Sequence, residues 1–236
     1  MTQFIAFVGL VSAGIAAVLW QRQVALRREA FIRNFTLPKG LFDKLRKHHP
    51  ALTSKDCQLI SQGLRQFFLA HLKSGRKYVS MPSQVVDDLW HELILYTKNY
   101  QSFCHKAFGR FLHHTPAVVL SKGQQSNEGI RRCWRFACLE ENINPRSPTR
   151  LPLLFALDGK LNIPNGFHYI ADCEAVRKQT SNEAGGSTVH CGADFSSSSF
   201  DGGTAGLDST SGSDADGDGD GDSGGDGCGG GGCGGD

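Results

Sequence analysis

The chain has 236 residues, of which 25 are Lys or Arg and 23 are Asp or Glu. This length excludes a large two-domain enzyme. Its eight scattered cysteines exclude a small disulfide-rich scaffold, and its 15 Phe and three Trp exclude a chain without a core. Charge is divided unevenly: residues 181–236 contain one Glu, ten Asp and no Lys or Arg, so their formal charge is −11 and that of residues 1–180 is +13.

The first predicted element is an apolar N-terminal helix, because residues 1–21 carry no charged side chain. At about 1.5 Å per residue they span roughly 31 Å, the thickness of a bilayer core. A cleaved signal peptide normally begins with a basic region, and a buried soluble helix is usually amphipathic. Neither feature is present, so the sequence favours a single transmembrane anchor over both alternatives.

Arginines follow this run and no basic residue precedes it. The positive-inside rule then predicts a single-pass protein of the cell membrane with its N-terminus outside and residues 22–236 in the cytoplasm. There the cysteines would be mostly reduced. We expect membrane lipid and another protein as partners, and no nucleic acid, since the basic residues of the body are scattered. The arginines are Arg22, Arg27, Arg28 and Arg33.

Residues 22–145 read as a helical domain. Apolar residues recur at helical spacing in segments separated by proline and glycine. Thr53 or Ser54 is expected to cap the third of these helices. The predicted helices are 23–34, 41–48, 54 to about 74, 83 to about 100, a continuation towards Pro116, and 127–141.

Residues 146–180 read as a small irregular or β annex, in which Asp158 and Gly159 predict a hairpin between apolar residues. Residues 181–236 are dominated by Gly, Ser and Asp and predict a disordered acidic tail that contributes no core. The fold class is therefore mainly α, with a transmembrane helix, a helical domain, this annex and a disordered tail.

Residues 81–116 contain a high density of acidic, aromatic, Cys and His side chains in a specific pattern. The pattern consists of Asp88, Trp90, His91, Tyr100, Phe103, Cys104, Gly109, His113 and His114. With these residues the chain resembles the glycine-rich domain-containing protein-like family, of which it would be a membrane-anchored member; its glycine-rich C-terminus fits the resemblance. Many members have a second His where Leu93 stands, and the resemblance implies no catalytic activity.

The same segment predicts a candidate metal site for zinc or iron. Asp87 and Asp88 lie four and three residues before His91, so both can reach its imidazole on a helix. Further ligands are available after residue 100 if the chain folds back between Thr97 and Ser102. The predicted ligands are Asp88, His91, Cys104, His113 and His114.

Two other interpretations of this segment stay open: a purely structural role, and acid–base catalysis by Asp88 and His91. We assign no catalytic residue, because the sequence contains no phosphate-binding loop and no hydrolase or metalloprotease motif. Cys133 and Cys138 are five residues apart, which points them to different sides of a helix.

The tail contains two further features. Residues 214–222 imitate the start of a calcium loop, but Gly225 stands where an EF-hand needs Glu. Cys228 and Cys233 are available for a soft metal or for modification. The first function that the sequence favours is interaction or scaffolding at a membrane. The alternative is a metal-binding enzyme or sensor using His91 with Cys104, His113 and His114, and a third is a substrate for tail modification.

Overall fold

The computed structural model describes residues 2–114, 124–171 and 190–196. These residues form seven α-helices, one short parallel strand pair and a 3-10 helix. The mainly α fold class is therefore confirmed. The predicted features of residues 197–236, including the disordered tail, the calcium-like repeat and the two cysteines near the C-terminus, lie outside the described residues.

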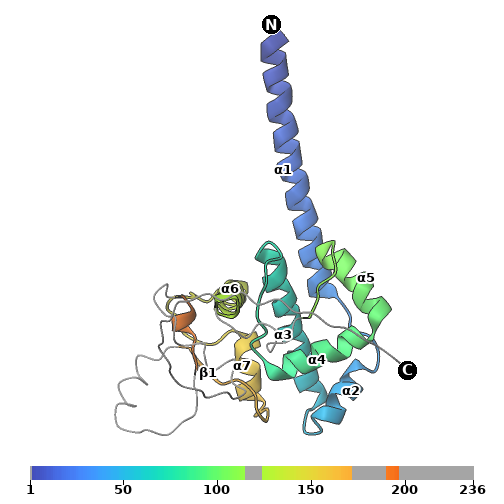
Figure 1. Ribbon diagram of the computed structural model, residues 1–236, viewed down its shortest axis with the longest axis vertical. Helices are drawn as coiled ribbons and strands as arrows, with labels where there is room; N and C mark the ends of the chain where they lie inside the picture. Colours follow the sequence, from blue (N-terminus) through green and yellow to red (C-terminus); the bar gives the residue numbers. More distant parts are fainter. Residues whose placement is uncertain (1, 115–123, 172–189, 197–236) are drawn as a thin grey trace, which may run out of the picture.

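Helix α1 (Thr2–Asn34) is continuous and projects from the body (Figure 1). The stretch from Gly9 to Asn34 is long and apolar enough to cross a membrane by length and composition, and its apolar 18-residue window has no residue buried inside the structure. Trp20 is 68% exposed. Only the last turns reach the body, where Ile32 is fully buried and Phe31 and Phe35 pack against Phe103. Thus α1 is exposed along most of its length and packs against the body only at its C-terminal end.

The body is built around α3 (Ser54–Lys73), with α2 (Leu41–His48), α4 (Gln84–Leu95) and α5 (Thr97–Phe108) on one side and α6 (Gln124–Glu140) and α7 (Leu153–Lys160) on the other (Figure 1). Thr53 caps α3 as predicted: its hydroxyl accepts a hydrogen bond from the Asp56 amide, and its own amide donates to Asp56. Gly63 lets α3 approach α7, because a Cβ there would collide with Leu157.

Two predictions for the C-terminal part are wrong. The hairpin expected around Asp158 is helix α7, whose Leu154, Phe155 and Leu157 are buried in the core. Within the predicted tail, residues 190–196 are folded and reach the core through Phe195. They contribute strand β2 (His190–Cys191), paired in parallel with β1 (Tyr169–Ile170), and the 3-10 helix η3 (Ala193–Ser196).

Gly192 shows how closely this C-terminal segment packs. A Cβ at Gly192 would overlap the indole ring of Trp134 on α6. The Trp134 ring also packs against Phe155 and Phe195, with ring centroids 5.0 Å and 5.8 Å away. The predicted boundary at residue 181 therefore cuts through the packed body.

Candidate metal centre

Helix α4 separates its side chains into an apolar face and a polar face. Val85, Val86, Leu89, Trp90 and Leu93 are buried in the core. The opposite face holds polar side chains that are only partly covered, namely Asp87, Asp88, His91 and Glu92. Three carboxylates and an imidazole are therefore held in fixed register along one helix.

The first turn of α4 is held by Asp158 of α7, a carboxylate that is only 1% exposed. It accepts hydrogen bonds from the Ser83 hydroxyl at 2.7 Å and from the Gln84, Val85 and Phe167 amides at 2.7, 3.2 and 2.9 Å. A negative charge at a helix N-terminus satisfies unpaired amides and interacts favourably with the helix dipole. Asp158 therefore fixes the position of the turn that carries Asp87.

The polar face of α4 meets a second segment at Asp87. Its carboxylate lies 2.9 Å from Nε2 of His114 and 3.6 Å from Nδ1 of His91. The rings of His91 and His114 are 4.3 Å apart. One ligand atom from each of the three residues lies within 4.8 Å of the others. We call Asp87, His91 and His114 the His–Asp cluster.

His114 reaches this cluster because the chain reverses after α5. Gly109 ends α5 with a positive φ of 73°, a conformation that favours glycine. The Tyr100 hydroxyl then donates a 2.6 Å hydrogen bond to the Leu112 carbonyl, which holds the following loop against the body. The buried Trp90 completes the support: its indole N–H donates to Tyr100, and its ring lies 4.6 Å from that of His114.

The donor set of the His–Asp cluster suits a divalent transition metal. Two imidazoles with one carboxylate are the ligands of several catalytic zinc sites and of non-haem iron sites. Half of the His91 side chain is exposed, whereas those of Asp87 and His114 are 22% and 14% exposed. A metal held here would have one side open to solvent, where water or a small ligand can bind.

The structure brings together two of the five predicted ligands, His91 and His114. Asp88 points instead to the end of α2, where its carboxylate lies 2.7 Å from Nε2 of His49, the residue that follows the helix. Cys104 is fully buried, and burial raises the pKa of its thiol. His113 is exposed and packs on the ring of Phe111.

Asp87 is the ligand that the predicted set omitted. Its spacing of four residues from His91 already allowed contact, and the choice of Asp88 overlooked that the two neighbouring carboxylates face different elements. The importance of Asp158 had no sequence signal, because its partners at the start of α4 are more than 70 positions away in the chain.

The polar face of α4 continues towards α2 beyond the His–Asp cluster. Glu92 lies 3.3 Å from Nε2 of His48 and 3.7 Å from Nζ of Lys44. Together with the contact between Asp88 and His49, these pairs join α2 to α4. They are ordinary surface pairs, and we assign them a structural role.

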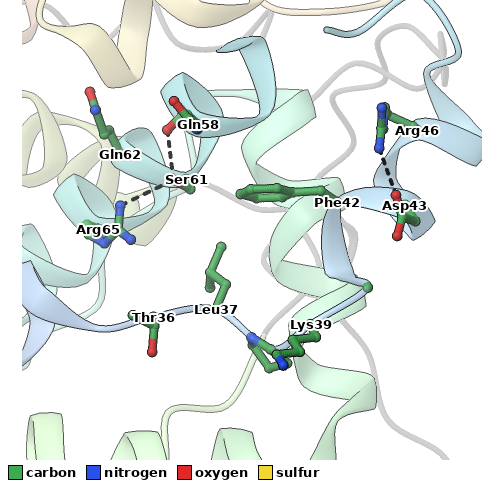
Figure 2. A pocket seen from close by; sticks show the side chains of 12 residues that line it. Thr36, Leu37, Lys39, Phe42, Asp43, Arg46, Gln58, Ser61, Gln62 and Arg65 are labelled. Atoms are coloured by element: carbon green, nitrogen blue, oxygen red, sulfur yellow. Dashed lines mark hydrogen bonds and ion pairs between the residues drawn. The ribbon is translucent and has the colours of Figure 1, made fainter. Parts of the chain in front are cut away.

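A separate hollow of about 530 Å³ lies between α2, α3 and residues 36–40 (Figure 2). Ser61 donates to the Gln58 carbonyl and accepts from Arg65, and Arg65 also donates to the Phe35 carbonyl. On α2, Arg46 pairs with Asp43. The polar groups of this hollow bond mainly with one another, so we assign it no ligand.

The described cysteines do not form a second metal site. Cys57, Cys104, Cys133 and Cys138 are free and buried, and burial raises the pKa of Cys138 to about 12. Cys191 is disulfide-bonded, with its partner outside the described residues. Disulfides are rare in the cytosol, so this bond disagrees with the predicted cytoplasmic side.

A family model covers the whole body. The model described as UCP032817-like matches residues 27–195. The chain belongs to this family. It is an uncharacterised family, and the match does not support the glycine-rich name in particular. No curated protein and no solved structure matches the chain. The matched range includes every residue of the His–Asp cluster and ends at Phe195, in agreement with the packed residues 190–196.

Proposed function

We propose that this protein binds a divalent transition metal, zinc or iron, through Asp87, His91 and His114, and that it does so at a membrane to which α1 anchors it. One observation carries the metal proposal: ligand atoms from two separate segments lie within 4.8 Å of one another. The buried supports of these ligands, Asp158 and Trp90, strengthen it, since metal ligands are usually held by a packed surrounding shell.

The metal proposal is tested by measuring bound zinc per chain after equilibrium dialysis of the full-length protein in neutral detergent. We expect one zinc per chain, and its loss in His91→Ala and His114→Ala. His113→Ala is the matched control, because this neighbouring imidazole is exposed and lies outside the His–Asp cluster. Equal zinc content in His114→Ala and His113→Ala would contradict the proposal.

The membrane setting is supported by the exposed apolar surface of α1, which includes Phe4, Phe7, Leu10 and Ile15. A water-soluble protein rarely exposes such a surface. The protein should sediment with membranes and resist carbonate extraction. A soluble product beginning after residue 14 would identify a cleaved signal peptide instead.

The side of the membrane is a separate question. The four arginines after the apolar run favour the cytoplasm for the body, and we keep that proposal. The disulfide at Cys191 favours an oxidising compartment. Protease added to intact cells distinguishes the two, because a cytoplasmic C-terminus is protected and an external one is cleaved. The resemblance to the glycine-rich domain-containing protein-like family, like the scaffold role, stays a prediction.

A further inference from the structure

A basic groove of about 880 Å³ lies between the C-terminal end of α3, one face of α6 and residues 144–146. The charged residues of its lining are mostly basic: six are Lys or Arg, and one, Glu128, is acidic. That acid is already paired, at 3.1 Å, with an arginine of the same lining. The basic residues are Lys73, Lys77, Arg131, Arg132, Arg135 and Arg146.

Three of these cations have no counter-charge among the residues that the structure describes. Lys77, Arg135 and Arg146 are exposed, and none of them forms an ion pair within the part of the chain that the structure describes. Lys73 differs, because Glu29 and Glu140 hold it at 3.1 and 2.8 Å. Unpaired charges of one sign that line one concavity raise the local concentration of the opposite charge.

The C-terminal end of α3 and helix α6, which supply lining residues of the groove, lie on the side of the body from which α1 projects (Figure 1). The ion pair between Lys73 of the lining and Glu29 of α1 shows which turn of α1 lies beside the rim of the groove. Glu29 comes eight residues after Gln21, the last residue of the uncharged run. Eight residues of helix span about 12 Å, and the headgroup layer of one leaflet is roughly 5–8 Å thick. With residues 1–21 across the bilayer, as proposed, the rim of the groove would lie just below the lipid headgroups.

The lining also contains apolar surface beside the cations. Leu139 is 51% exposed, and the partly buried Phe136 lies next to Arg135, whose guanidinium sits 6.0 Å from the phenyl ring. A cationic pocket with an apolar wall suits an amphiphile better than it suits a purely polar anion. The chain's own residues 197–236, which follow Ser196 of the lining in sequence, are rich in Asp and Gly and contain few apolar side chains.

We infer that this groove binds the headgroup of an anionic phospholipid, of the phosphatidylserine class, in the membrane that holds α1. The lipid phosphate and carboxylate would lie on Lys77, Arg135 and Arg146, and the glycerol region on Leu139 and Phe136. The inference rests on the proposed membrane anchoring, but not on metal binding. Such a contact would fix the orientation of the body, and with it the His–Asp cluster, relative to the membrane surface.

The test uses the full-length protein in neutral detergent and a fluorescent short-chain phosphatidylserine, with binding followed by anisotropy. The test variant combines Lys77→Gln, Arg135→Gln and Arg146→Gln. The control combines Lys47→Gln, Lys55→Gln and Lys160→Gln, which remove the same charge from exposed sites on α2, the first turn of α3 and the last turn of α7, outside the lining of the groove. Each basic residue near an anionic lipid surface contributes about fivefold in affinity, so the test variant should bind about a hundredfold more weakly and the control should match the parent.

Several results would overturn the inference. Equal weakening in both variants would show a non-specific charge effect, and equal binding of a phosphatidylcholine with the same chains would show that the detergent micelle captures the probe. Inorganic phosphate that competes as well as the lipid would identify a soluble anion as the ligand. Binding that appears only after residues 201–236 are removed would identify the tail as the occupant. The short-chain lipid needs no anchored protein, so failure of the anchoring proposal, tested by carbonate extraction, is distinguishable from failure of this one.

Discussion

Asp158 should be the polar residue whose loss destabilises this fold most. Its buried carboxylate accepts four hydrogen bonds, two of them from amides in the first turn of α4. Hydrogen bonds to a charged group contribute about 1.5–3 kcal/mol each but are not additive. Leaving buried donors unpaired costs more than removing an exposed pair, so we expect Asp158→Ala to lower the free energy of unfolding by about 3–5 kcal/mol.

Asp158→Asn should cost nearly as much, because its amide group would face N–H donors where Oδ2 now accepts two hydrogen bonds. Urea denaturation of the full chain in neutral detergent measures the effect through the fluorescence of the buried Trp90 and Trp134. Asp43→Ala is the control, since this exposed carboxylate pairs with the neighbouring Arg46 on the surface of α2 and its loss should cost less than about 1 kcal/mol. A loss below 1 kcal/mol in Asp158→Ala would refute the capping role.

Three other predictions test the body. Burial lowers the pKa of His71 from 6.5 to about 4, so between these pH values the unfolded chain binds more protons than the folded one. The resulting contribution to the free energy of unfolding, about 3 kcal/mol, is complete above pH 6.5 and is lost as the pH falls to 4. In His71→Gln, the free energy of unfolding from urea denaturation should therefore depend less on pH over this range. Trp90→Ala removes a core ring and should cost about 3–5 kcal/mol; a melting temperature within two degrees of the parent would show that it contributes no packing. Gly192→Ala should lower the free energy of unfolding by about 1–3 kcal/mol, because the added methyl group overpacks against Trp134. A stop codon after Ser196 should leave the melting temperature unchanged. Equal melting temperatures for Gly192→Ala and the parent would mean that residues 190–196 do not pack against the body.

The helical part of the fold was predictable because its signals are local. The long uncharged run and the capping box at Thr53 act within a few residues of where they stand in the chain. The predicted continuation towards Pro116 was too long, because Gly109 ends α5 after Phe108. Helix α7 was missed because it is only eight residues long and lies among prolines. Its stability comes from burying Leu154, Phe155 and Leu157 against α3 and α4, which no local pattern reveals.

The candidate site was predictable in part for the same reason. His91 and its neighbouring carboxylates are local on one helix, but the choice between Asp87 and Asp88 depends on which distant element each one faces. The expected reversal near Thr97 occurs where α4 ends and α5 begins, yet the reversal that delivers His114 is the one after Gly109. That second turn excludes His113 from the His–Asp cluster and leaves Cys104 in the core.

Anomalous diffraction at the zinc edge, from crystals of the zinc-loaded protein, tests the central claim most directly. We predict one strong peak per chain between α4 and the loop after Gly109. It should lie about 2.0–2.2 Å from a carboxylate oxygen of Asp87 and from one ring nitrogen each of His91 and His114, the usual zinc–ligand distances. A zinc ion bound elsewhere, or no peak at the His–Asp cluster in crystals soaked at millimolar zinc, would contradict the account.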